Sequence, residues 1–137
     1  MDLTPYQLNE YLFDAFPATA KAGYRCTDLG EGWAEAHWTY DASALRPGGY
    51  IPGPTMFTLA DLALWFAIFT KIGIEGMAVT TDMTMHFLRP AMGGNLVGRA
   101  ELTKVGRRLA HGKIDLWIDG DAERLVAFGS GAYAIPA

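Results

Sequence analysis

The chain has 137 residues, the length of one ordinary domain, and 50% of them are hydrophobic against 19% that are charged. This composition is typical of a globular protein and excludes an intrinsically disordered chain. The formal net charge of −4 argues against nucleic acid as a partner, because nucleic-acid-binding domains are normally basic.

Cysteine usage and apolar patterning predict a cytoplasmic protein without a membrane segment. The single cysteine, Cys26, cannot form an internal disulfide, as expected in a reducing compartment. The N-terminal segment carries Asp2, Glu10 and Asp14 and no basic residue, which is not the pattern of a signal peptide. The longest apolar run, residues 54–69, is shorter than the roughly 20 residues that span a bilayer.

The first elements in chain order are a helix and a hairpin. Thr4 is a suitable N-cap and Pro5 suits the first helical position. Apolar residues then recur at helical spacing until Pro17, which predicts a short amphipathic helix that ends there. From residue 22 to residue 40 the pattern alternates as in strands, and Gly30-Glu31-Gly32 is typical of a hairpin turn.

After this hairpin, the sequence predicts a loop over residues 41–53 and a helix over residues 54–71. The helix is apolar on every side at helical period, which is typical of a helix buried all round. Asp61 is the only charged residue between Pro54 and Phe69. A carboxylate in that setting must lose much of its hydration or be hydrogen-bonded. Perturbed acids of this kind cluster at functional sites, although structural networks also hold them.

The remainder of the chain has the pattern of strands. Residues 77–88, 96–105, 109–118 and 125–135 alternate in this way, and glycine-containing turns separate them. A helix without a polar face must be wrapped, and a strongly curved antiparallel sheet is the simplest wrapping. The sequence therefore predicts one α+β domain over residues 1–137 with a hotdog fold: a curved antiparallel sheet around a central apolar helix, plus a short N-terminal helix.

Three motifs follow one another on these elements. They are Gly53 with Leu59-Ala60-Asp61 at the start of the central helix, Val79-Thr80-Thr81-Asp82-Met83 followed by Phe87-Leu88-Arg89-Pro90-Ala91, and Lys104-Val105-Gly106-Arg107-Arg108-Leu109-Ala110. Together they resemble the hotdog-fold acyl-CoA thioesterases of the phenylacetate-pathway (PaaI-like) type, over about residues 42–135. The resemblance implies hydrolysis of a small-to-medium or aryl acyl-CoA to the free acid and CoA, with no cofactor, by a homodimer or homotetramer.

The chain departs from that family at one motif. The family usually carries His-Gly-Gly ahead of the helix, whereas this chain has Pro52-Gly53-Pro54. Related hotdog dehydratases rely on a catalytic histidine, so its absence counts against a dehydratase or hydratase. The thioesterase interpretation holds provided that the amide of Gly53 is the oxyanion donor. The alternative is that Pro-Gly-Pro is only a rigid turn.

Three residues are candidates for catalysis of thioester hydrolysis. The reaction needs a base or nucleophile, a water, and donors for the developing oxyanion. Asp61 is the candidate base or nucleophile, and the Gly53 amide lies at the positive end of the helix dipole. The resemblance places Thr80 where a hydroxyl helps to hold the attacking water. The alternatives are an Asp61 hydrogen-bonded to a loop backbone and a Thr80 that only fills a strand.

Four further residues are candidates for substrate binding. Arg46 occupies a loop position where related enzymes place a polar side chain that contacts substrate, and Thr81 adjoins the catalytic candidate on its strand. Arg107 and Arg108 belong to the densest basic spot on an acidic chain and suit the phosphates of CoA. A solvated loop arginine and a charged hairpin turn are the alternatives. The histidines sit singly, without metal-ligand spacing, so no metal site is predicted.

Helix geometry adds a hypothesis about assembly. Gly53 and Asp61 are eight residues apart, roughly 12 Å along one helix at 1.5 Å per residue, so both cannot touch one carbonyl group. We therefore expect a site shared between two subunits, with Asp61 of one chain facing Gly53 of its two-fold mate. A non-catalytic acyl-CoA or lipid-binding hotdog module is the first alternative function, and a domain in which Asp61 serves only the fold is another.

Overall fold

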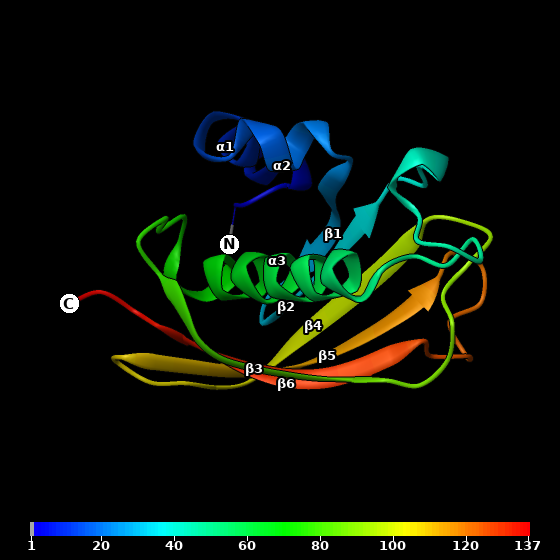
Figure 1. Ribbon diagram of the computed structural model, residues 1–137. Coiled ribbons are helices and arrows are strands. Elements are labelled where there is room, and N and C mark those ends of the chain that lie inside the picture. Colours follow the sequence, from blue (N-terminus) through cyan, green and yellow to red (C-terminus); the bar gives the residue numbers. More distant parts are fainter. Residues whose placement is uncertain (1) are drawn as a thin grey trace.

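The structure, a computed structural model, describes residues 2–137. The elements in chain order are α1 (Pro5–Ala15), α2 (Pro17–Lys21), β1 (Tyr24–Gly30), β2 (Trp33–Trp38), a short 3-10 helix (Ala42–Ala44), α3 (Gly53–Ile72), β3 (Val79–Phe87), β4 (Leu96–Val105), β5 (Leu109–Ile118) and β6 (Ala127–Ala134). The strands form one antiparallel sheet in the order β1-β2-β4-β5-β6-β3. Helix α3 lies along the inside of the curved sheet, with α1 and α2 on its far side from β3 and β6 (Figure 1). The predicted hotdog fold is confirmed.

Helix α3 is the core of the domain. It begins at Gly53, ends at Ile72, and stops because Gly73 adopts a positive φ of 86° that ends the helical turn. Its 20 residues are long and apolar enough to cross a membrane by length and composition alone. However, 67% of its most apolar window is buried inside the protein, as in the core helix of a globular fold.

Glycines on the sheet let α3 pack closely against it. Gly112 of β5 and Gly131 of β6 are cross-strand partners beneath Leu64. A Cβ at Gly112 would lie 2.7 Å from Leu64 Cδ1, and a Cβ at Gly131 would lie 3.0 Å from Leu64 Cδ2. A side chain at either position would press on Leu64, so the two glycines let the sheet curve closely around the helix.

Replacing Gly112 with alanine tests this packing. The new methyl group would also lie 3.0 Å from the carbonyl oxygen of Glu101, so the backbone as well as Leu64 must shift. We expect Gly112→Ala to lower the free energy of unfolding by about 1–3 kcal/mol, measured by urea denaturation. Ser130→Ala, on the exposed face of β6, is the control and should stay within about 0.5 kcal/mol of wild type. Equal stabilities of the two variants would contradict the packing argument.

The N-terminal helices are docked onto the sheet and onto α3. Thr4 and Gln7 form a capping box at the start of α1, and Leu8 and Leu12 are fully buried beneath it. The side-chain amide of Asn9 accepts a hydrogen bond from the Cys26 amide at 2.7 Å and donates one to the Cys26 carbonyl at 2.8 Å. This pair of bonds ties α1 to β1 at Cys26, next to the point where the pairing of β1 with β2 shifts by one residue.

Helix α2 is absent from the sequence-based prediction, which ended helical structure at Pro17. In the structure Pro17 occupies the first position of a second helix, where its missing amide hydrogen has no cost and its fixed φ favours the helix. A proline therefore both ended α1 and began α2, and the sequence pattern showed only the first effect.

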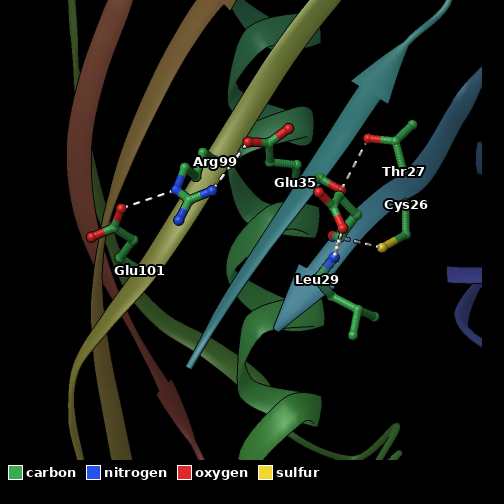
Figure 2. Close-up of polar contacts among 7 residues, drawn as sticks. Cys26, Thr27, Leu29, Glu35, Arg99 and Glu101 are labelled. Carbon is green, nitrogen blue, oxygen red and sulfur yellow. Dashed lines mark hydrogen bonds and ion pairs between the residues drawn. The ribbon is translucent and has the colours of Figure 1, made fainter. Parts of the chain in front are cut away.

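An ionic cluster joins strands on the outer face of the sheet. The Arg99 guanidinium on β4 donates to Glu101 at 3.0 Å and to Glu35 on β2 at 3.2 Å (Figure 2). The same guanidinium lies over the ring of Trp33, 4.1 Å from its centroid. Partly exposed ion pairs add little stability, so the main effect of the cluster is to hold these side chains in place on the outer face. The neighbours of Arg99 on β4, Gly98 and Ala100, face the core.

Candidate active site

The carboxylate of Asp61 is held through one of its two oxygens. The hydroxyl of Thr80 donates to Asp61 Oδ1 at 2.8 Å, and the hydroxyl of Tyr133 donates to the same oxygen at 2.6 Å. The Tyr133 hydroxyl also lies 3.2 Å from the backbone carbonyl oxygen of Asp61. Within residues 2–137, no group donates to Oδ2 of Asp61. One oxygen is thus fixed and the other is left without a protein partner.

The sheet register brings these two hydroxyls together. Thr80 on β3 and Tyr133 on β6 are direct cross-strand partners. The register of this pair of strands shifts between Thr80 and Asp82, so Thr81 is an extra residue in a bulge. Bulges re-aim side chains next to active sites, and here the Thr80–Tyr133 pair faces the helix at Asp61.

Tyr133 is a permanent hydrogen-bond donor in this arrangement. Only 4% of its surface is exposed. Burial raises the pKa of the Tyr133 phenol strongly, and the negative charge of Asp61 and their hydrogen bond raise that pKa further. The phenol therefore keeps its proton across the neutral pH range and remains able to donate a hydrogen bond to the carboxylate.

A cavity of about 460 Å³ opens beside Asp61, between α2, α3 and the start of β3. This volume is typical of sites for small molecules. Its lining residues are mostly apolar with a few hydroxyls: Phe16, Thr19, Phe57, Thr58, Asp61, Leu62, Trp65, Gly76, Ala78, Val79, Thr80 and Tyr133.

The expectation that α3 is buried all round is wrong on one face. Asp61 is half-buried, and Phe57 is 39% exposed. The sheet covers one side of α3 and the N-terminal helices cover another, which leaves a stripe at helical spacing between them. Residues of this open stripe are Pro54, Phe57, Thr58, Asp61, Leu62 and Trp65. Asp61 therefore lies on a surface groove rather than deep in the core.

The amide of Gly53 lies at the other end of this stripe. Pro52, the N-cap residue, provides no side-chain cap, and the Gly53 amide donates no hydrogen bond within residues 2–137. A Cβ at Gly53 would meet only the ring of Phe87, at 3.8 Å, so the position is open. The free amides of a helix N-terminus favour negative charge. The Gly53 amide can therefore donate a hydrogen bond to an anionic oxygen from outside the chain.

Further cavities surround the start of α3. One of about 500 Å³ is lined by Gly53, Pro54, Phe57, Thr58 and Phe87, and it shares Phe57 and Thr58 with the cavity at Asp61. Another cavity, of about 450 Å³, is lined by Gly53 together with Arg46 and Arg89. The groove thus runs along α3 from a cationic end to the carboxylate.

The remaining predicted residues lie outside the cavity at Asp61. The Thr81 hydroxyl donates to the carbonyl of Ala132 at 3.3 Å, so its side chain is tied to the neighbouring strand. Arg107 and Arg108 are exposed in the turn between β4 and β5. That turn lies at the same end of the sheet as Tyr133, because Tyr133 pairs with Ala110 just after the turn.

Sequence reasoning missed Tyr133 and the position of Arg89. A tyrosine alone among small residues, in Gly131-Ala132-Tyr133-Ala134, was the available signal for an inward-facing phenol. Arg89 appeared only at the end of a strand and within the second motif, without a role of its own. In the structure its guanidinium donates to the carbonyl of Leu125 at 2.8 Å and lines the cavity near Gly53.

The comparison with protein families agrees with this fold. A model described as the thioesterase superfamily matches residues 48–124. This match covers more than half of the chain, so the protein belongs to the thioesterase superfamily. No curated protein sequence matches the chain.

Solved structures resemble the chain over most or all of its length. A candidate thioesterase from a Silicibacter species is 34% identical with a TM-score of 0.89, covering 100% of this chain and 94% of that one. A mutant form of the phenylacetic acid degradation protein PaaI from Thermus thermophilus is 26% identical with a TM-score of 0.75, covering 88% and 99%. A thioesterase from Haemophilus influenzae, at 23% identity, a TM-score of 0.82 and coverage of 98% and 91%, shows the shared fold.

Proposed function

We propose that the protein is an acyl-CoA thioesterase of the PaaI-like type, which hydrolyses a small-to-medium or aryl acyl-CoA to the free acid and CoA. The observation that carries the proposal is the Asp61 carboxylate, fixed through Oδ1 by Thr80 and Tyr133 at the wall of a 460 Å³ cavity. Membership of the thioesterase superfamily and the similarity to PaaI of Thermus thermophilus support it.

In this mechanism Asp61 Oδ2 acts on the reacting atoms. As a general base it takes a proton from water, and the water oxygen attacks the thioester carbonyl carbon. The C–S bond then breaks, the sulfur leaves with a proton as the CoA thiol, and the acid keeps the new oxygen. Direct attack by Oδ2, giving an anhydride that water cleaves, yields the same products. The Thr80 hydroxyl donates a hydrogen bond to Oδ1, and its oxygen keeps lone pairs that can accept a hydrogen bond from the water.

The oxyanion would be stabilised by Gly53 of a second copy. Gly53 and Asp61 of one chain lie roughly 12 Å apart along α3, too far for one carbonyl group. Strand β3 is one of the two edge strands of the sheet, and Val79 and Phe87 on it are 54% and 50% exposed. Exposed strand edges are normally covered. Pairing of β3 with β3 of a two-fold mate covers this edge and brings the open stripes of two α3 helices together in a homodimer, or in a dimer of dimers.

Three basic side chains would hold the CoA moiety. Arg46 lines the cavity at Gly53, and Arg107 and Arg108 are exposed at the sheet end that carries Tyr133. Guanidinium groups bind phosphate oxygens through paired hydrogen bonds. Thr81 would contact the substrate through its backbone, because its hydroxyl donates to the carbonyl of Ala132 at 3.3 Å.

A thiol-release screen tests the proposal. Purified protein is mixed with short, medium, long and aryl acyl-CoAs, and the free thiol is measured with a chromogenic disulfide reagent. We expect turnover well above the spontaneous rate for at least one small-to-medium or aryl thioester. Binding of thioesters without any turnover would instead identify a non-catalytic acyl-CoA-binding module.

Tyr133→Phe tests the support of the carboxylate. The ring still fits the site, but Asp61 Oδ1 loses the donor at 2.6 Å. Because hydrogen bonds to charged groups contribute about 1.5–3 kcal/mol, we expect kcat to fall by about tenfold or more while KM changes little. Tyr40→Phe, at an exposed tyrosine, is the matched control and should keep wild-type kinetics. An unchanged kcat in Tyr133→Phe would show that the phenol does not position Asp61.

A further inference from the structure

The N-terminal helices supply one wall of the cavity that contains Asp61. Phe16, at the corner between α1 and α2, and Thr19 of α2 both line it. This corner is a fixed part of the fold, because Asn9 binds both backbone groups of Cys26 and Leu12 is buried beneath α1. The cavity therefore ends against a built surface rather than a loose terminus.

Aromatic contacts fix where this wall lies. The ring of Phe16 packs edge-on against Trp65 of α3, with ring centroids 5.7 Å apart and an interplanar angle of 71°. Tyr11 packs against the same tryptophan at 5.9 Å and against Phe69 at 6.1 Å. Gly76 leaves room for the Tyr11 hydroxyl, since a Cβ there would collide with it. Aromatic pairs of this geometry are favourable and directional.

The two rings have different exposure. Trp65 is 5% exposed and forms the inner surface of the cavity, whereas Phe16 is 49% exposed and forms its outer rim. Trp65 follows Asp61 by one helical turn, about 6 Å along the axis. A group attached to a thioester carbonyl at Asp61 and directed along the stripe therefore meets Trp65 and then Phe16.

We propose that Phe16, which packs against Trp65, limits the size of the acyl group. The site then binds compact aryl or short acyl groups and excludes long linear chains. This inference rests on the proposed thioesterase function. The cavity of about 460 Å³ must also hold the thioester group and the attacking water, so only part of its volume is free for the acyl group. Its surfaces near the rim are apolar rings, which suit an aryl group.

Phe16→Ala tests the proposal against a graded series of linear acyl-CoAs and one aryl acyl-CoA. We expect the ratio of kcat/KM for long chains to kcat/KM for the aryl substrate to rise by about tenfold, because a hydrophobic pocket discriminates by about that factor for each methylene or two. Phe16→Trp, with a larger ring, should restore or sharpen the wild-type preference. Phe13→Ala is the matched control, since Phe13 is 53% exposed on α1 and does not line this cavity.

Binding of non-hydrolysable S-alkyl-CoA thioethers, measured by calorimetry, separates this inference from the proposed function. Phe16→Ala could improve the binding of long thioethers relative to short ones although no thioester is turned over. This result would overturn the proposed thioesterase function and support the role of Phe16 in limiting chain length. If chain-length dependence of turnover and of binding is the same in wild type and Phe16→Ala, the inference is overturned. An equal shift in Phe13→Ala also overturns it, because the effect would then come from α1 as a whole.

Discussion

Asp61→Asn should abolish thioester hydrolysis and leave the protein folded. The amide oxygen of asparagine can still accept the hydrogen bonds of Thr80 and Tyr133, at 2.8 Å and 2.6 Å in the wild type. The amide cannot take a proton from water or attack a carbonyl group. Since a general base contributes about 10²–10⁴-fold, we expect kcat to fall by about three orders of magnitude. The measurement is initial thiol release under saturating substrate.

Two controls make this result specific. Asp82→Asn removes an exposed carboxylate from the same strand as Thr80 and should keep wild-type kcat. The melting temperature of Asp61→Asn should remain within a few degrees of wild type, because the half-buried site loses a charge and keeps its contacts. If the wild-type protein hydrolyses no thioester and Asp61→Asn lowers the melting temperature strongly, Asp61 serves only the fold.

Mixed dimers should recover activity from two inactive chains. Gly53→Val places a side chain in the open space before Phe87 and blocks access to the amide, and the loss of one oxyanion donor costs about 10²–10³-fold. In a dimer of one Asp61→Asn chain and one Gly53→Val chain, one of the two shared sites keeps Asp61 and Gly53 intact. We therefore expect about half of the wild-type rate per purified heterodimer.

The same experiment discriminates between a shared site and a site within one chain. If each chain used its own Asp61 and its own Gly53, both sites of the heterodimer would carry a substitution. Dual-tag purification gives heterodimers of known composition, and homodimers of each variant are the controls. Heterodimers no more active than those homodimers would overturn the shared site.

The hotdog fold was predictable because its strongest signals are local. The apolar run of α3 and the alternation of the strands gave the sheet and its central helix, and the expected bounds 54–71 differ from Gly53–Ile72 by one residue at each end. Helix α2 was missed because Pro17 fits a helix end and a helix start equally well. The glycines beneath Leu64 have meaning only once the strands are paired with the helix.

The candidate site was predictable only in part. The isolated charge of Asp61 marked it directly, and Thr80 came from the family resemblance and lies at hydrogen-bonding distance. Tyr133 is 72 residues away along the chain, and it meets Asp61 only through the pairing of β6 with β3. Long-range strand pairing is not encoded in any local pattern. For the same reason the open stripe on α3 was not foreseen, because the extent of its covering depends on where the sheet edge ends.

Hydrolysis in water enriched in ¹⁸O tests the central claim, that Asp61 directs water onto a thioester, most directly. The protein is incubated with its preferred acyl-CoA, and the products are analysed by mass spectrometry beside a reaction with Asp61→Asn. We predict equal amounts of free CoA and free acid, with at least one solvent oxygen in the acid carboxyl group, and neither product above background for Asp61→Asn. Unchanged acyl-CoA, a hydrated or dehydrated acyl-CoA, or equal product formation by Asp61→Asn would contradict the account.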